Sequence, residues 1–339
     1  MNYRYSRQIL FKDIAEAGQE KLQKAKVAII GCGALGSHIA ETLVRAGVGT
    51  IYLADRDYVE SSNLQRQQLF TEQDAIDMKP KVIAATKRLL DIRSDVTIYT
   101  YFQHVDNALI EKLAKEVDLI MDGTDNFETR LLMNDAAYKY NIPWIYGACV
   151  GSSGVVFPFI PKQTPCFRCL LPALPSLNES CDTVGIISPA VHITASIQCA
   201  EALKILTGNI DAVRKKVHHF DCWNNAQMDV GVSKIRKEDC LTCSVQAIYP
   251  ELQSSENSRF AVLCGRDAVQ ILPSKRRKLS LDEAELVAKK INATWKKTTY
   301  FEVIFKESYK IIVFQDGRMI LHGLQDINQG RKLYTELFG

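Results

Sequence analysis

A strand, a tight glycine-rich turn and a helix follow one another near the N-terminus, and they constrain the fold more than any other feature. The run KVAIIG is apolar and β-branched, and the segment Ser37–Ala46 repeats apolar residues at helical spacing. Between them Gly31, Gly33 and Gly36 form the pattern G-x-G-x-x-G. Such glycines let a backbone approach phosphates, and Asp55, which ends the next apolar run, can accept hydrogen bonds from ribose hydroxyls. The pattern predicts a nucleotide site, and taken alone it favours NAD or FAD over a purely structural turn.

Apolar runs continue to alternate with helical segments along most of the chain. Such alternation predicts a parallel sheet that binds ligands at the carboxyl ends of its strands. The expected fold class is α/β, a Rossmann-like, doubly wound and mostly parallel sheet. The strand-like runs are 50–55, 97–102, 117–122 and two within 144–160, the helical segments are 80–91, 128–140 and 189–207, and residues 218–225 are expected as an edge strand.

The length of 339 residues indicates two domains, because single hydrophobic cores stop growing near ~250 to 300 residues. The stretch 249–258 is typical of a linker, so we expect one domain over 1–250 and a small α+β domain over 255–339. In the second domain, Asp316-Gly317 between two alternating apolar runs predicts a β-hairpin. The other elements expected there are strands at 261–264, 269–272 and 300–305 and helices at 281–292 and 326–338.

The charge pattern gives no whole-protein argument for binding nucleic acid or an anionic membrane, because the net charge is only +3. The basic run KRRK at 275–278 is expected to be a solvated loop. The N-terminus lacks the apolar core of a signal peptide, and no apolar run reaches the ~18 residues of a membrane span. We therefore expect a cytoplasmic protein with no nucleic-acid or membrane partner and with mostly reduced cysteines.

Polar side chains follow two of the predicted strands. Arg66 stands among Asn63, Gln65 and Gln67 in the first of these segments, and fixed positive charge beside phosphates suits phosphoryl or nucleotidyl transfer better than hydride transfer. A solvated loop is the alternative for these residues and for Lys79 and Lys81, which follow soon after. The strand-like run 117–122 leads into DGTDN, residues 122–126, where carboxylates could bind Mg²⁺ or only form a turn.

Four cysteines form two C-x-x-C pairs, one in a long Pro- and Cys-rich loop expected over 161–188. Two such pairs supply four thiolates for a tetrahedral, structural zinc ion, and redox activity is the alternative for each pair alone. The ligands expected for Zn²⁺ are Cys166, Cys169, Cys240 and Cys243.

Cys181 stands alone in the polar segment ESCDTVG of the same loop, where it is either a reactive thiol or an inert one. The five remaining cysteines lie within or beside apolar runs and are expected to be buried and inert. They are Cys32, Cys149, Cys199, Cys222 and Cys264.

Taken together, these motifs resemble the MoeB/ThiF family of adenylyltransferases, relatives of the ubiquitin-activating enzymes. The resemblance covers residues 3–250 and rests on RYSRQI, GCGALGS, DRDYVESSNLQRQ, KPK, DGTDN, CFRC, CDTVGIISP and CLTC. It implies that ATP occupies the glycine-rich loop and that the substrate is the C-terminal glycine carboxylate of a ubiquitin-like sulfur-carrier protein ending in Gly-Gly. The carboxylate would attack the α-phosphorus and expel pyrophosphate. No residue distinguishes a molybdopterin from a thiamine carrier, so both stay open, and we favour the molybdopterin carrier.

The resemblance also implies roles for single residues. Asp55 should hold the ribose, and Asp125 should position Mg²⁺. Arg7 should act as an arginine finger in the site of the other subunit of a homodimer. Cys181 matches a family cysteine associated with sulfur transfer. The residues expected at the phosphates are Asn63, Arg66 and Lys81, with Lys79 as a close alternative to Lys81, and Asp57 and Gln67 are expected in the same nucleotide site.

The final domain resembles an extension of some bacterial members, and it has no recognisable rhodanese-like loop. A separate sulfur donor is therefore expected. Two other functions stay open at this stage. They are an NAD- or FAD-dependent oxidoreductase and a non-catalytic protein that binds a ubiquitin-like partner.

Overall fold

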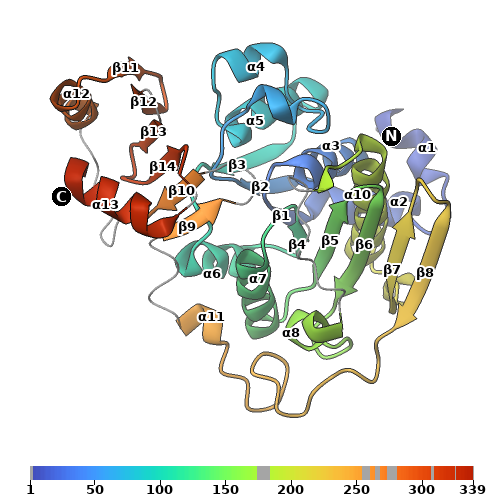
Figure 1. Cartoon of the computed structure of the whole chain (residues 1–339). Coiled ribbons are helices and arrows are strands. Elements are labelled where there is room, and N and C mark those ends of the chain that lie inside the picture. Colours follow the sequence, from blue (N-terminus) through green and yellow to red (C-terminus); the bar gives the residue numbers. More distant parts are fainter. Residues whose placement is uncertain are drawn as a thin grey trace. The chain divides into compact units, whose positions relative to one another are not determined.

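The computed structural model describes residues 3–173, 184–253, 260–263, 268–272, 281–306, 309–324 and 326–338. The chain divides into two compact units, the first made of Met1–Glu179 and Gly185–Ser254 and the second mainly of Ser255–Gly339. Figure 1 labels the elements of both. The roles assigned to the two predicted domains, 1–250 and 255–339, stay predictions.

An eight-stranded sheet forms the centre of the first unit. Its strands are β1 (Lys26–Ile30), β2 (Thr50–Ala54), β3 (Thr97–Tyr101), β4 (Leu119–Asp122), β5 (Trp144–Val150), β6 (Ser153–Phe159), β7 (Lys216–Asp221) and β8 (Ala226–Gly231). They are ordered β3-β2-β1-β4-β5-β6-β7-β8, and the pairs from β3 to β5 are parallel while the rest are antiparallel. The order changes direction between β1 and β4, and ligands of such sheets bind outside the carboxyl ends of the strands at that point. The predicted fold class, a Rossmann-like doubly wound sheet, is confirmed.

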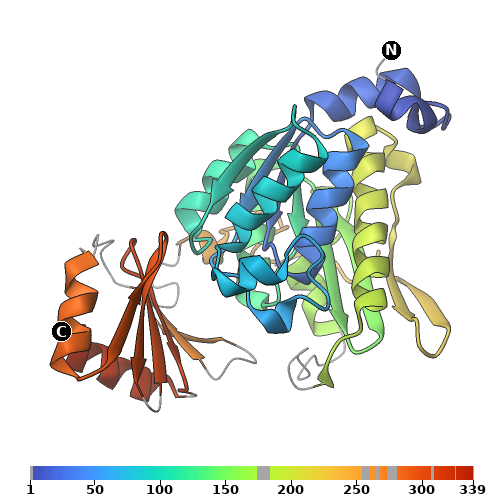
Figure 2. The same cartoon turned by 90° about the horizontal axis from the view of Figure 1, so that it is seen from above.

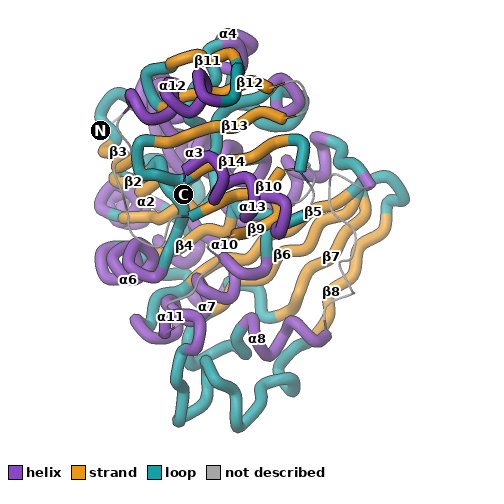
Figure 3. The backbone as a smooth tube through the Cα atoms, turned by 60° about the vertical axis from the view of Figure 1, so that its left-hand side comes forward, coloured by secondary structure: helices purple, strands orange, loops and turns teal. Residues whose placement is uncertain are grey.

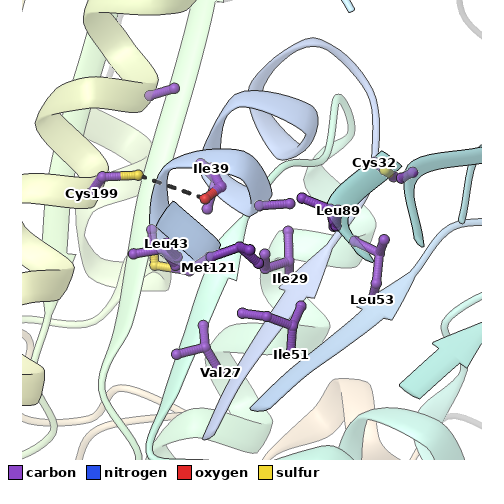
Figure 4. Packing of buried hydrophobic residues seen from close by; sticks show 14 of the residues in the cluster. Val27, Ile29, Cys32, Ile39, Leu43, Ile51, Leu53, Leu89, Met121 and Cys199 are labelled. Atoms are coloured by element: carbon purple, nitrogen blue, oxygen red, sulfur yellow. Dashed lines mark hydrogen bonds between the residues drawn. The ribbon is translucent and has the colours of Figure 1, made fainter. Parts of the chain in front are cut away.

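Helices cover both faces of this sheet. The helices of this unit are α1 (Ser6–Ile9), α2 (Ala15–Lys24), α3 (Ala34–Ala46), α4 (Glu72–Ile76), α5 (Lys81–Ile92), α6 (Asn107–Glu116), α7 (Phe127–Tyr140), α8 (Phe167–Leu170), α10 (Ser188–Thr207) and α11 (Pro250–Gln253). Val27 and Ile29 of β1 pack with side chains of α3, α5 and α10, as Figure 4 shows. Ala28 and Ile30 point to the opposite face, into a cluster with α6 and α7. A β-strand sends alternate side chains to opposite faces, so an uninterrupted apolar run buries both sides.

Three expectations for the first unit are wrong. The helix expected from Ser37 begins at Ala34, directly after Gly33, and α8 lies within the expected loop 161–188. The strand expected at the edge over 218–225 is β7, and β8 lies outside it, as Figure 3 shows. All six residues of β8 are exposed, so this strand has no buried apolar face that could reveal it in the sequence.

The second unit contains a six-stranded antiparallel sheet in the order β11-β12-β13-β14-β10-β9. Its elements are β9 (Phe260–Leu263), β10 (Ala268–Ile271), α12 (Leu281–Lys290), β11 (Thr294–Lys297), β12 (Phe301–Lys306), β13 (Tyr309–Phe314), β14 (Met319–His322) and α13 (Ile327–Phe338). Side chains of α12 and α13 pack on one face of the sheet. Figure 2 shows this second unit in orange and red. The hairpin predicted at Asp316-Gly317 joins β13 to β14, with Gly317 at φ +84°. The small α+β domain is thus confirmed, although β11 was not predicted.

Candidate nucleotide site

The turn after β1 is built from glycines that cannot carry a side chain. Gly31 has φ +89°, and a Cβ atom there would lie 2.5 Å from the carbonyl oxygen of Gly123. A Cβ atom on Gly36 would overlap the carbonyl oxygen of Gly31. The end of β1, the end of β4 and the start of α3 therefore pack backbone against backbone.

Gly33 differs from these two glycines because space lies open beside it. Apart from its chain neighbours and the backbone of α3, the described atom within 4 Å of a Cβ atom there is Gln67 Nε2, at 3.8 Å. Gly33 directly precedes α3, a helix of 13 residues whose first N–H groups have no partner within the helix. A helix N-terminus of this kind suits an anion such as phosphate.

Asp55 joins the glycine turn to the segment after β2. Its carboxylate accepts hydrogen bonds from Cys32 N at 2.6 Å and from Asp57 N at 2.7 Å. Burial raises the pKa of Asp55, while the charge of Lys81 and these two donors act in the opposite direction. Each carboxylate oxygen retains a lone pair, so Asp55 can still accept a hydrogen bond from a ligand hydroxyl.

Lys81 and Lys79 lie in different surroundings. Lys81 is the first residue of α5, its side chain is 4% exposed, and its Nζ lies 3.5 Å from Asp57 Oδ2. Lys79 Nζ lies 2.9 Å from Asp74 Oδ1 and 3.3 Å from Asp77 Oδ2, away from the carboxylates after β2. The geometry favours Lys81 as the cation at the nucleotide site.

The polar residues after β2 form one compact turn. Asn63 is buried, its Oδ1 accepts from Glu60 N at 3.2 Å, and Arg66 donates to Ser62 O at 2.9 Å. Gln67 is buried near Gly33, and within the described residues its Oε1 has no hydrogen-bond partner. A buried amide oxygen of this kind indicates a missing ligand donor or water.

The two acids that end and follow β4, Asp122 and Asp125, differ in burial. Asp122 is fully buried, and its oxygens accept from Arg130 Nε at 2.8 Å and from Thr124 N at 2.9 Å. Asp125 is exposed, and Asn126 Nδ2 lies 3.4 Å from its Oδ1. Mg²⁺ is commonly bound through one or two carboxylates together with substrate phosphates, so the exposed Asp125 fits such an ion while Asp122 does not.

These residues meet at one edge of the sheet. Strands β2, β1 and β4 are parallel neighbours, and Asp55, Gly31 and Asp122–Asn126 stand at or just beyond their carboxyl ends. Asp57 and Lys81 are tied to the same edge by the hydrogen bond from Lys81 N to Asp57 O, at 2.9 Å. The arrangement places a helix N-terminus, a buried lysine and an exposed carboxylate at the carboxyl ends of neighbouring strands.

Arg7 does not join this site within its own chain. It is exposed on α1, and the next residue, Gln8, donates to Ala46 O at 2.8 Å. Ala46 ends α3, while the glycine turn precedes the same helix, so the two ends of α3 lie about 20 Å apart. Arg7 therefore lies too far from the glycine turn of its own chain to contact a ligand there.

The four predicted zinc ligands lie together, and all four Sγ atoms fall within 4.8 Å of one another. Cys166 Sγ lies 3.5 Å from Cys240 Sγ, and Cys169 Sγ lies 3.7 Å from Cys243 Sγ. Zn–S bonds of about 2.3 Å in a tetrahedron separate the sulfurs by about 3.8 Å. The backbone N–H of Lys237 also donates to Cys169 Sγ at 3.4 Å. The cluster therefore fits a structural zinc ion.

The other cysteines give a mixed result. Cys181 and Cys264 lie outside the described residues. Cys32 and Cys199 are buried as predicted, and burial raises the pKa of the Cys199 thiol to about 12. The expectation of full burial is wrong for Cys149 and Cys222, which are half-buried near the ends of β5 and β7.

Two buried residues beside the site were not predicted from the sequence. Arg130 of α7 contacts Asp122, Thr124 and Gly147, and Gln198 of α10 donates to Asp122 O at 2.9 Å. The sequence signal for Arg130 is a single arginine in the first turn of a helix, two residues after the acidic Glu128. That signal is weak, because long charged side chains often reach solvent from such positions.

A doubly wound sheet with a phosphate-accepting glycine turn at its switch point defines a nucleotide-binding α/β protein. The ThiF family model matches residues 5–243, and the chain belongs to this family. No helix in the described part of the chain is both long enough and apolar enough to cross a membrane.

Relatives and solved structures agree with the family assignment. The chain is 43% identical to the "Sulfur carrier protein ThiS adenylyltransferase" of Bacillus subtilis over 339 residues, 100% of both chains. It is 40% identical to the Escherichia coli protein of the same name over 219 residues, 64% of this chain and 86% of that one. The crystal structure of E. coli MccB with ATP matches with a TM-score of 0.62 and 25% identity, over 72% of this chain and 75% of MccB.

Proposed function

We propose that this chain uses ATP to adenylate the C-terminal carboxylate of a sulfur-carrier protein of the ThiS kind. The observation that carries the proposal is the grouping of the glycine turn, the buried Lys81 and the exposed Asp125 at one sheet edge. A glycine motif alone does not separate ATP from NAD. A buried cation at the place expected for phosphates favours a nucleotide that is consumed in the reaction.

In the proposed reaction a carboxylate oxygen of the carrier attacks the α-phosphorus of ATP. The new acyl–phosphate bond forms as the bond to pyrophosphate breaks, and pyrophosphate leaves with the electron pair. Lys81 and Arg66 stabilise the negative charge on the phosphate oxygens, with Asn63 and Gln67 as hydrogen-bonding partners. Asp55 orients the ribose. Mg²⁺ held by Asp125 would add positive charge beside the phosphates when bound.

The carrier of the ThiS kind replaces our sequence-based expectation of the molybdopterin carrier. The relative that matches over its whole length is named for ThiS. Because the match includes the second unit, it bears on the whole chain. The names of the curated relatives favour neither an NAD- or FAD-dependent oxidoreductase nor a non-catalytic binder.

A homodimer with Arg7 acting in the partner's site is part of the proposal. Arg7 is exposed at the far end of α3 from its own glycine turn. Around it Tyr3 is 90%, Leu10 73% and Phe11 55% exposed. Exposed apolar side chains grouped in this way are typical of a surface that a second subunit covers.

Three further elements of the proposal concern the cell and the sulfur step. The protein acts in the cytoplasm, without nucleic-acid or membrane partners. Sulfur comes from a separate donor protein. Cys181 takes part in transferring that sulfur to the adenylated carrier.

The test is ATP–pyrophosphate exchange with purified carriers. Exchange that requires a ThiS-type carrier, and that is absent with the same carrier lacking its last two glycines, supports the proposal. Exchange with a molybdopterin-type carrier alone would change the carrier but keep the reaction. No exchange with either carrier would refute the function.

A further inference from the structure

A single guanidinium group fixes the segment that carries Asp125. Arg130 donates from Nε to Asp122 Oδ2 at 2.8 Å and from Nη2 to Thr124 O at 2.7 Å. Nη2 also lies 3.2 Å from Gly147 O on β5. The Arg130 side chain is 5% exposed and that of Asp122 is fully buried. The arginine therefore joins the end of β4, the turn beyond it and β5.

Asp122 and Asn126, at the two ends of the same turn, hold its backbone as well. Asp122 Oδ1 accepts from both Thr124 N, at 2.9 Å, and Thr124 Oγ1, at 2.8 Å. Asn126 caps α7 by accepting from Thr129 N at 2.9 Å. The backbone on each side of Asp125 is thus held by buried or capping groups.

Asp125 itself has little side-chain support. Its carboxylate is exposed, and the described contact to it is Asn126 Nδ2 at 3.4 Å. The held backbone therefore sets where Asp125 stands and the direction of its Cα–Cβ bond, from which the carboxylate extends. The Thr124 carbonyl that Arg130 holds belongs to the peptide unit that Asp125 completes.

We propose that Arg130 is a positioning residue that orients Asp125 for a divalent cation bound with ATP. This inference rests on the proposed function, because that function places the cation at Asp125. Groups that orient a metal ligand typically change metal affinity by about 10- to 100-fold when they are removed. Lysine at this position keeps the buried charge opposite Asp122 but lacks the fork that reaches Asp122 and Thr124 O together.

The competing explanation is that Arg130 only stabilises the fold, as buried ion pairs can. Arg93 offers a matched control. It is 3% exposed, donates to Val44 O at 3.1 Å and Val48 O at 2.8 Å, and pairs with Asp95 at 3.0 Å. Like Arg130, it joins two carbonyls and one carboxylate, but it lies at the far end of α3 from the glycine turn.

The experiment makes two measurements on the full-length protein. The first is the Kd for Mn²⁺ in the presence of α,β-methylene-ATP, measured by electron paramagnetic resonance. The second is the Mg²⁺ concentration that gives half-maximal ATP–pyrophosphate exchange. We expect R130K to raise the Kd for Mn²⁺ and the half-maximal Mg²⁺ concentration by about tenfold or more. R93K should leave both quantities within about twofold of wild type. Saturating Mn²⁺ should restore most of the R130K exchange rate. Thermal unfolding without metal shows whether each variant is folded.

Thr124→Val provides a second variant if R130K does not fold, because it removes only the hydroxyl bond to Asp122. It should weaken Mn²⁺ binding several-fold. If R130K is folded and binds Mn²⁺ as wild type does, the inference is overturned and the proposed function stays intact. If R130K is unfolded, unchanged Mn²⁺ binding by T124V has the same consequence. Wild-type protein that binds nucleotide but no Mn²⁺ would overturn it as well, whereas an absence of exchange with every carrier would count against the function.

Discussion

The ammonium nitrogen of Lys81 lies 3.5 Å from Asp57 Oδ2, with only 4% of the lysine side chain exposed. The same lysine is close enough to Asp55 for its charge to act against the burial that raises the pKa of that carboxyl. The buried ammonium group of Lys81 is therefore positioned beside Asp55 and Asp57 before any ligand binds, where it can also attract the negative charge of a phosphate. This relationship underlies the first prediction.

Lys81→Ala should lower the rate of ATP–pyrophosphate exchange by about 100-fold or more, because a preorganised cation at the phosphates is lost. Lys79→Ala is the control, since Lys79 pairs with Asp74 and Asp77 on the surface. It should change the rate by less than about twofold. Equal losses in the two variants would show that the phosphate contact is misassigned.

The glycine turn predicts that two neighbouring substitutions act differently. Gly36→Ala should lower the free energy of unfolding by about 3 kcal/mol, because its Cβ atom would overlap Gly31 O. Gly33→Ala should cost less than about 1 kcal/mol, because space lies open there. It should nevertheless weaken ATP binding by about tenfold, since the methyl group would stand at the helix N-terminus. Denaturant unfolding and calorimetric ATP binding measure the two effects, and a G33A variant that binds ATP normally would count against a phosphate beside Gly33.

The cysteine cluster predicts about one zinc ion per chain, measured by elemental analysis. Cys240→Ser should lose this zinc and lower the free energy of unfolding by about 3 kcal/mol or more. Cys222→Ser removes a half-buried cysteine outside the cluster and should keep both properties. Metal-free wild-type protein of unchanged stability would exclude a structural role for zinc.

His38 predicts a dependence of stability on pH. Burial, followed by the charge of the adjacent His192, lowers the pKa of His38 from 6.5 to about 4. Within the described residues, Nε2 of His38 is buried without a hydrogen-bond partner, so the charged ring is poorly accommodated. Because the folded pKa lies below the unfolded one, the unfolded chain takes up the proton first. The stabilisation is complete above about pH 6.5 and is lost as the pH falls toward about 4.

His38→Gln should therefore reduce the loss of unfolding free energy between about pH 7 and about pH 5 by at most about 2 kcal/mol. Denaturant unfolding at the two pH values measures this difference. His219→Gln, at a half-buried histidine of β7, is the control. A variant at His38 with the same pH dependence as wild type would show that the ring is protonated as easily in the folded chain as in the unfolded one.

The parts of this fold that the sequence predicts are those determined by neighbouring residues. The strand, turn and helix from Lys26 to Ala46 depend on apolar spacing and on glycines that no side chain can replace. The zinc ligands were also predictable, because two C-x-x-C pairs are specific even though 74 residues separate Cys166 from Cys240.

The unpredicted parts depend on contacts between different elements of the fold. Arg130 meets Asp122 and Gly147 because the first turn of α7 lies beside β4 and β5, and a single arginine in a helix does not show this. The position of Arg7 depends likewise on how α1 packs beside the end of α3. The choice between Lys79 and Lys81 needed the burial of each side chain, since both follow the same strand in the sequence.

The most direct test of the central claim is detection of the carrier adenylate itself by intact-protein mass spectrometry. Wild-type protein, ATP, Mg²⁺ and a ThiS-type carrier should yield a carrier whose mass has increased by one AMP, and hydroxylamine should remove it as expected for an acyl phosphate. The same mixture with a carrier lacking its final glycine should yield none, and with the Lys81→Ala variant the adenylate should form about 100-fold more slowly. A carrier that stays unmodified while the protein binds both ATP and the carrier would contradict the account.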